Sequence, residues 1–155
     1  MHCREETCMT KTETHVPVFA TTLQKTHEWL QELELLASLR NQAEAYTVLR
    51  QVLHALRDRL PTNEAAQLGA ELPMLIRGFY FEGWKPSAAP GRARSLKAFL
   101  ETIGPLPSPH AAFDAEQAVR SVLLVLDHRI SIGEMADIRH AMPAELRDLW
   151  PAYAT

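Results

Sequence analysis

The first half of the chain resembles the second half when the sequence is shifted by about 70 positions, and the alignment needs no gap. Such a repeat predicts that one structural unit occurs twice. Each unit alone would leave an apolar face bare, so we expect the two halves, about 19–84 and 92–151, to pack on each other with approximate two-fold symmetry. The aligned pairs are Ala45/Ala115, Arg50/Arg120, Val52/Val122, Leu53/Leu123, Leu56/Leu126, Arg59/Arg129, Glu64/Glu134, Ala66/Ala136, Pro73/Pro143, Arg77/Arg147 and Tyr80/Trp150.

Composition narrows the class of protein. A chain of 155 residues with 46% apolar residues can bury the core of one domain. Its formal net charge of -3 gives no bulk attraction to nucleic acid or to anionic lipid. The longest apolar runs, 72–76 and 122–126, are far shorter than a membrane-spanning helix, and the first residues have no apolar signal segment. We therefore expect a cytoplasmic protein without membrane association.

Apolar residues recur every three or four positions along most of the chain, which is typical of helices that are buried on one face. We expect an all-α fold: a single helical-bundle domain over residues 18–151, preceded by a polar, disordered tail at 1–17. Residues 85–91 and 104–109 are rich in proline and interrupt the helices. The expected helices cover 19–37, 42–60, 62–70, 73–83, 92–103, 113–129, a short segment after 131, and 143–150.

Two local patterns refine this prediction. Ser131 and Glu134 have the spacing of a capping box, and Thr62 is a candidate cap for the short helix that follows it. The run from Val122 to Leu126 is apolar almost all the way round its helix, so we expect this helix to be central.

Metal-binding and catalytic patterns are weak. His2, Cys3, Cys8 and His15 lie in the expected tail, with a spacing that matches no common zinc site. Glu134, Asp137 and His140 form one helical stripe, but their counterparts Glu64, Gln67 and Ala70 do not supply a second ligand set. No nucleophile elbow or phosphate-binding loop is present. We therefore expect no metal, no cofactor, no catalytic residue and no enzyme activity, and we expect His54 and His128 at the surface or at helix ends.

Three charged residues of the first half, Arg59, Glu64 and Arg77, recur in the second half as Arg129, Glu134 and Arg147. They could cap helix ends and cross-link helices, or they could form two symmetry-related binding spots. The structural role is favoured, because paired arginine and glutamate at helix ends need no ligand.

An aromatic segment, residues 79–84, is the best candidate for a binding surface. Four aromatic residues in six positions cannot all face one core from a helix, so at least one is expected to be partly exposed. Trp84 beside Lys85 could anchor a partner, or it could fold back over the helix end. Four cations follow without an intervening acid. The candidate interaction surface comprises Tyr80, Trp84, Lys85, Arg92, Arg94 and Lys97.

Several segments resemble the bacterial DUF2267 family, whose function is unknown. They are Phe19–Leu30, Val52–Pro61 with its Leu-Arg-Asp-Arg-Leu-Pro motif, Leu72–Trp84 with Leu-Pro-Met-Leu-Ile-Arg-Gly, and Leu146–Pro151. The resemblance spans about Phe19 to Pro151. It implies a small, mostly helical bacterial protein, and it supplies no activity, cofactor or catalytic residue.

The sequence thus favours a non-enzymatic interaction module that binds another protein or a second copy of itself, as a monomer or a homodimer. A first alternative is a nucleic-acid-associated protein that uses Arg92, Arg94 and Lys97, although the net charge makes nucleic acid the less favoured partner. A second alternative is a carrier of a small molecule or metal with its site between the two halves.

Overall fold

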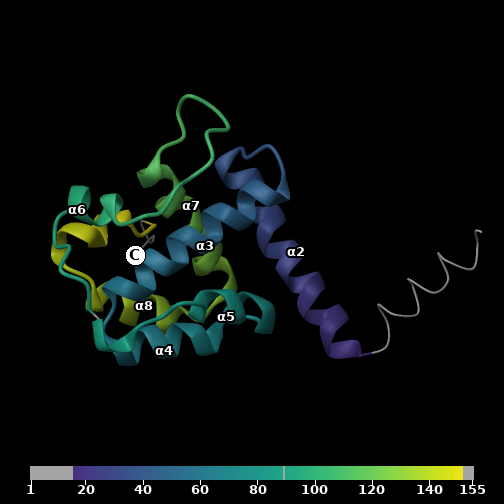
Figure 1. Ribbon diagram of the computed structural model, residues 1–155, viewed down its shortest axis with the longest axis horizontal. Coiled ribbons are helices and arrows are strands. Elements are labelled where there is room, and N and C mark those ends of the chain that lie inside the picture. The colour runs from purple at the N-terminus through teal and green to yellow at the C-terminus, as the bar shows by residue number, and fades with distance from the viewer. Residues whose placement is uncertain (1–15, 89, 152–155) are drawn as a thin grey trace, which may run out of the picture.

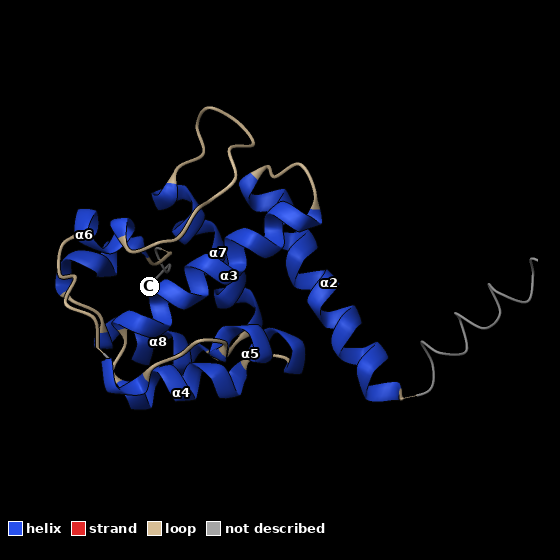
Figure 2. Ribbon diagram, viewed as in Figure 1, coloured by secondary structure: helices blue, strands red, loops and turns tan. Residues whose placement is uncertain are grey.

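The computed structural model describes residues 16–88 and 90–151. Every regular element in these two ranges is a helix, which confirms the all-α prediction (Figure 2). The elements are α2 (Pro17–Ala37), α3 (Gln42–Arg59), α4 (Thr62–Glu71), α5 (Met74–Phe81), the 3-10 turn η1 (Pro86–Ala88), α6 (Leu96–Glu101), α7 (Ala115–Arg129), α8 (Ile132–Ala141) and the 3-10 helix η2 (Ala144–Leu149).

Helices α3 and α7 lie at the centre of the bundle and contact each other, and α2 packs across both of them (Figure 1). Helix α4 packs on α8 and on α5, while α6 and η2 pack together at the far side of the body. The N-terminal end of α2 projects beyond the body in the same view. No helix in the described ranges has the length and apolarity needed to cross a membrane.

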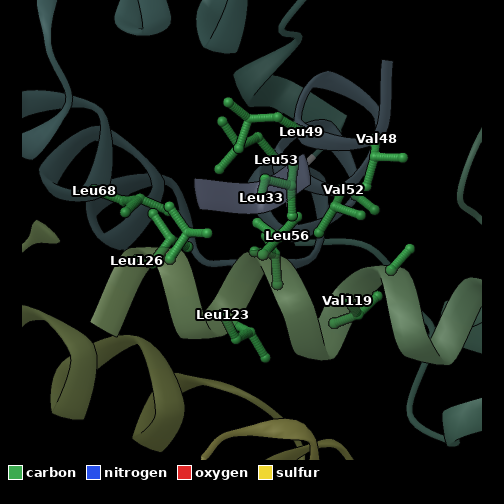
Figure 3. Close-up of a cluster of buried hydrophobic side chains, with 14 of the residues drawn as sticks. Leu33, Val48, Leu49, Val52, Leu53, Leu56, Leu68, Val119, Leu123 and Leu126 are labelled. Carbon is green, nitrogen blue, oxygen red and sulfur yellow. The ribbon is translucent and has the colours of Figure 1, made fainter. Parts of the chain in front are cut away.

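The core lies between α2, α3, α4 and α7 (Figure 3). Helix α7 is buried on nearly all sides along 122–126, because Val122, Leu123, Val125 and Leu126 are all fully buried and Leu124 is partly buried. This confirms the central position predicted for it. Truncating a fully buried leucine of this cluster to alanine would cost about 2–5 kcal/mol in the free energy of unfolding, because a cavity remains.

Side-chain caps fix where several helices begin. Asn41, Ser95, Asp114 and Ser131 each accept a hydrogen bond from the backbone N–H three residues later, so they satisfy one amide that has no partner within the helix. Ser131 therefore caps α8 as predicted. The reciprocal bond of a capping box, from the N–H of Ser131 to the Glu134 carboxylate, is not among the described contacts, and one oxygen of Glu134 is buried without a partner among the described residues.

Several predicted helices differ from the structure in their ends or in their type. Pro17 is the first residue of α2 rather than the end of a tail, and residues 1–15 lie outside the described ranges. Thr62 starts α4 as a helical residue, and the preceding Pro61 is its N-cap without a side-chain bond. The last element is a 3-10 helix over 144–149. The fifth helix is shorter than 92–103, because the extended Ser95 caps it and the carbonyl of Ala93 accepts a hydrogen bond from Arg59.

The linker at 85–91 contains η1 and is otherwise irregular, as its prolines predicted. It is attached to the C-terminal end of α3, because the N–H of Gly91 donates to the carbonyl oxygen of Asp58 at 2.7 Å. A Cβ at Gly91 would lie 3.1 Å from that oxygen, so the close approach favours glycine. The linker thereby places Arg92 and Arg94 beside the end of α3.

Candidate interaction surface

Tyr80 lies in the core and cannot form part of an interaction surface. Its side chain is fully buried, and its hydroxyl donates to the carbonyl oxygen of Ala65 at 2.7 Å. Burial raises the pKa of this hydroxyl above its ordinary value. The prediction that Tyr80 contributes to the surface is therefore wrong, since α5 directs this ring against α4.

Arg57 fixes the C-terminal end of α5. Its guanidinium is buried and donates to the carbonyl oxygens of Tyr80 at 2.6 Å and Glu82 at 2.9 Å. Asp58 accepts from its Nε at 2.9 Å, so the charge is compensated. This role of Arg57 was not predicted from the sequence. Arg57 lies four residues after Leu53, on the buried stripe of its helix, and that spacing was the available signal.

Trp84 folds back over the end of α5, which is the second of the two alternatives drawn from the sequence. Its ring packs against Phe81 with centroids 5.4 Å apart, and the side chain is partly buried. Gly83 has φ of 74°, a left-handed conformation that favours glycine and reverses the chain after the helix. The indole Nε1 is buried and has no hydrogen-bond partner among the described residues. Part of the Trp84 side chain remains exposed to solvent.

The four cations of the candidate surface are exposed. Lys85, Arg92, Arg94 and Lys97 make no salt bridge and no side-chain hydrogen bond to any residue that the structure describes. Every other described arginine makes at least one such contact, and the set is Arg40, Arg50, Arg57, Arg59, Arg77, Arg120, Arg129, Arg139 and Arg147.

Two hollows show which of these cations lie together. A cavity of about 220 Å³ is lined by Asp58, Gly83, Lys85, Ala88 and Gly91. A smaller one, of about 60 Å³, shares Asp58 and Gly91 with it and also borders Arg92. Lys85 and Arg92 are therefore neighbours around the end of α3.

Arg94 lies close enough to act on Arg59. Burial lowers the pKa of Arg59, and the charge of Arg94 lowers it further. Three carboxylates at this end of the molecule each have another partner: Asp58 pairs with Arg57, Glu82 pairs with Arg50 at 3.2 Å, and Glu145 accepts from the N–H of Leu96 at 3.1 Å. None of them forms a salt bridge with Lys85, Arg92, Arg94 or Lys97 among the described residues.

The repeated arginines have structural roles, as favoured by the sequence analysis. Arg77 donates to the carbonyl oxygens of Gly69 at 3.1 Å and Leu72 at 2.9 Å, and so caps the end of α4. Arg147 donates to Met142 at 3.1 Å and caps α8 in the same way. Arg59 binds the linker, and Arg129 forms a salt bridge with Glu32 at 3.0 Å.

Glu64 and Glu134 occupy the first turns of α4 and α8, which pack together. Each has one buried oxygen without a partner among the described residues. Burial raises the pKa of Glu134, and the charges of Glu64, Asp137 and Glu71 raise it further. The described residues contain no group of three metal-ligating side chains, so the stripe of Glu134, Asp137 and His140 does not converge on one point. His2, Cys3, Cys8 and His15 lie outside the described residues.

The two singled-out histidines differ. His54 is partly buried, and its Nε2 lies 2.6 Å from the carbonyl oxygen of Phe79, so the prediction of a surface residue is wrong for it. Burial lowers the pKa of His54 despite this hydrogen bond. His128 is exposed at the end of α7, as expected, with Nδ1 3.0 Å from Glu32.

A larger groove of about 490 Å³ separates α2 from the turn between α4 and α5 and from the end of α7. Lys25, Arg77 and Arg129 contribute positive charge to it, and Glu28 and Glu71 contribute negative charge. This groove is the described feature that would suit the carrier alternative.

Comparison with known proteins gives a family and no activity. A search of curated proteins returned no match. The family model described as "Uncharacterized conserved protein (DUF2267)" matches residues 26–149, which is most of the chain. The chain therefore belongs to the DUF2267 family.

Proposed function

We propose that this protein acts by binding another protein and not by catalysis. The binding surface would be formed by Lys85, Arg92, Arg94 and Lys97 together with the exposed part of Trp84, and we call it the basic surface. The observation that supports this most is that Arg92 and Arg94 have no partner among the residues that the structure describes, while the other described arginines do.

The chemistry of this surface favours an acidic segment as the partner. The guanidinium group of arginine binds carboxylates with two parallel hydrogen bonds, and those of Arg92 and Arg94 have no partner in the described part of the chain. Trp84 adds a flat apolar edge next to Lys85, which is the combination found at the energetic centres of many interfaces. An acidic and partly apolar peptide segment would use both.

The test is affinity capture from the source organism with matched variants. The charge-reversed variant R92E/R94E/K97E should lose a captured protein that the wild type retains, while R92K/R94K keeps the charge and should retain most of it. The extract is divided, and one part is treated with nuclease. Capture of the same protein by the charge-reversed variant would overturn the proposal.

The nucleic-acid alternative uses the same cations, because phosphate and carboxylate groups both accept from arginine. It predicts that nuclease treatment abolishes capture and that affinity for a DNA duplex falls steeply with salt concentration. The carrier alternative predicts additional mass on the intact 17.5 kDa chain in native mass spectrometry.

We also infer that the two halves are related by an internal repeat. Two observations support this: α4 and α8 cover 62–71 and 132–141, and Arg77 and Arg147 cap them with equivalent bonds. The family resemblance further supports a bacterial protein, and the lack of long apolar runs supports a cytoplasmic one.

A further inference from the structure

The apolar stripe of α2 continues toward the N-terminus beyond the part that the body covers. Thr26 is the first buried residue of the helix, and one and two turns before it Leu23 and Phe19 are 48% and 60% exposed. This end of α2 projects from the bundle in Figure 1. The stripe therefore has the residue spacing of a buried helix face, but the side chains of Leu23 and Phe19 are exposed in the described structure.

The start of α5 extends this apolar area. The hydroxyl of Thr22 accepts a hydrogen bond from the N–H of Leu75 at 2.9 Å, so α2 and α5 are joined at this point. Met74 and Leu75 are 44% and 43% exposed. The apolar ridge, as we call it, consists of Val16, Val18, Phe19, Leu23, Met74 and Leu75.

The size of the ridge fits an interface. With roughly 150–200 Å² for a fully exposed large apolar side chain, the ridge presents on the order of 500 Å² of apolar surface. Two copies that cover each other would bury about twice that area. Polar atoms at the edges of the ridge would add to this buried area. The total then reaches the lower end of the roughly 1,200–2,000 Å² that a stable interface buries.

No described residue of the body packs over Phe19 and Leu23, which stay 60% and 48% exposed. Residues 1–15 are mostly polar and contain no run of apolar residues, so their composition does not match an apolar ridge. An apolar surface on another molecule is the better match.

Charge favours a second copy of the same chain. In a two-fold dimer the same patch of both copies forms the interface. A charged side chain near the axis would therefore lie close to the identical charge of the other copy and be repelled by it. Residues 16–24 contain no charged side chain, so the α2 part of the ridge can meet its copy without opposing charges, while Met74 at the other end borders the groove lined by Lys25, Glu28 and Arg77. We propose that the protein forms a two-fold dimer in which the projecting ends of α2 cross antiparallel, with Phe19 and Leu23 against the ridge of the other copy.

Gly78 provides an independent observation. It is exposed on α5, one turn after Met74, and a Cβ there would meet no atom within 4 Å. Glycine inside a helix is less stable than alanine, and no contact among the described residues requires it here, as is also true of Gly133 on α8. A closely packed helix of a second copy would explain why no side chain stands at this position.

The first test measures the oligomeric state of the full chain by sedimentation equilibrium over a wide concentration range. The wild type should form a reversible dimer of twice 17.5 kDa. F19S/L23S should weaken the dimer at least about 100-fold, because four apolar side chains leave the interface. L35S is the matched control, since Leu35 is 75% exposed on the same helix outside the ridge, and it should dimerise like the wild type.

The second test separates the interface from folding. G78A should raise the melting temperature of the dilute monomer and weaken dimerisation, whereas G133A, at another open glycine, should leave dimerisation unchanged. A wild type that stays monomeric throughout overturns the proposal, whatever else binds the ridge. An F19S/L23S dimer as tight as the wild type overturns it as well, and an unchanged G78A dimer overturns the placement of α5 at the interface.

Discussion

The hydroxyl of Thr22, on α2, accepts a hydrogen bond from the backbone N–H of Leu75, the second residue of α5. Pro73 precedes α5 and has no side-chain acceptor, so the cap comes from a different helix 53 positions away in the chain. The start of α5 is therefore held by tertiary structure as well as by its own sequence.

Replacing Thr22 with valine keeps the shape of the side chain and removes this acceptor. The free energy of unfolding should fall by about 1 kcal/mol, as for other lost helix caps, and a urea titration would measure it. Thr21→Val is the control, because the Thr21 hydroxyl donates only to Pro17 within its own helix. Equal losses in the two variants would contradict a capping role for Thr22.

Replacing Tyr80 with phenylalanine should destabilise the fold by about 1–2 kcal/mol, since the Ala65 carbonyl loses its buried donor. The pKa of Tyr80 is raised in the folded state, so its contribution to stability is complete below the unfolded pKa, near 10. It is lost as the pH rises further. Thermal unfolding from pH 8 to 11 should show a steeper loss for the wild type than for Y80F. Parallel curves would argue against the buried hydroxyl.

Replacing Glu134 with glutamine should stabilise the protein at pH 7. Burial and neighbouring carboxylates raise the pKa of Glu134, so its protonated form is favoured by folding. The contribution of protonated Glu134 to stability is complete below the pKa of the unfolded state, about 4.5. It is lost as the pH rises through the higher pKa of Glu134 in the folded state. The advantage of E134Q should therefore shrink toward pH 4. Glu101→Gln, at an exposed position, should have no such pH-dependent effect.

Replacing Trp84 with alanine tests how much of this ring is structural. Trp84 is partly buried against Phe81, so we expect a loss of about 1–3 kcal/mol in the free energy of unfolding. Lys85→Ala, at the exposed neighbour, should change stability little. A melting temperature unchanged by W84A would show that the ring acts only on a partner.

The elements that the sequence predicted well are those with strong local signals. Pro61 ends the second helix, the spacing of buried residues marks α3 and α7, and Ser131 caps α8. In α7 the apolar run that begins at Val122 predicted a central helix, because a segment with few polar side chains can be buried on nearly all sides.

The misplaced residues depend on contacts between distant segments. Tyr80 looked available for a surface, and it is buried because Ala65, on α4, supplies an acceptor for its hydroxyl. The fifth helix starts after residue 92, because the carbonyl oxygen of Ala93 accepts a hydrogen bond from Arg59. Leu23 matches the buried stripe in spacing, but the described body ends before it. Helical periodicity contains no information on any of these three partners.

The attachment of the linker to α3 has a thermodynamic consequence for any molecule that binds there. Gly91 is tied to Asp58, and the carbonyl of Ala93 is tied to Arg59, so both ends of the segment that carries Arg92 are fixed before binding. A loose loop would lose backbone freedom on binding, at about 1–2 kcal/mol per ordered residue. Here the fold has already restricted the backbone on both sides of Arg92, and only the side chains lose freedom when a ligand arrives.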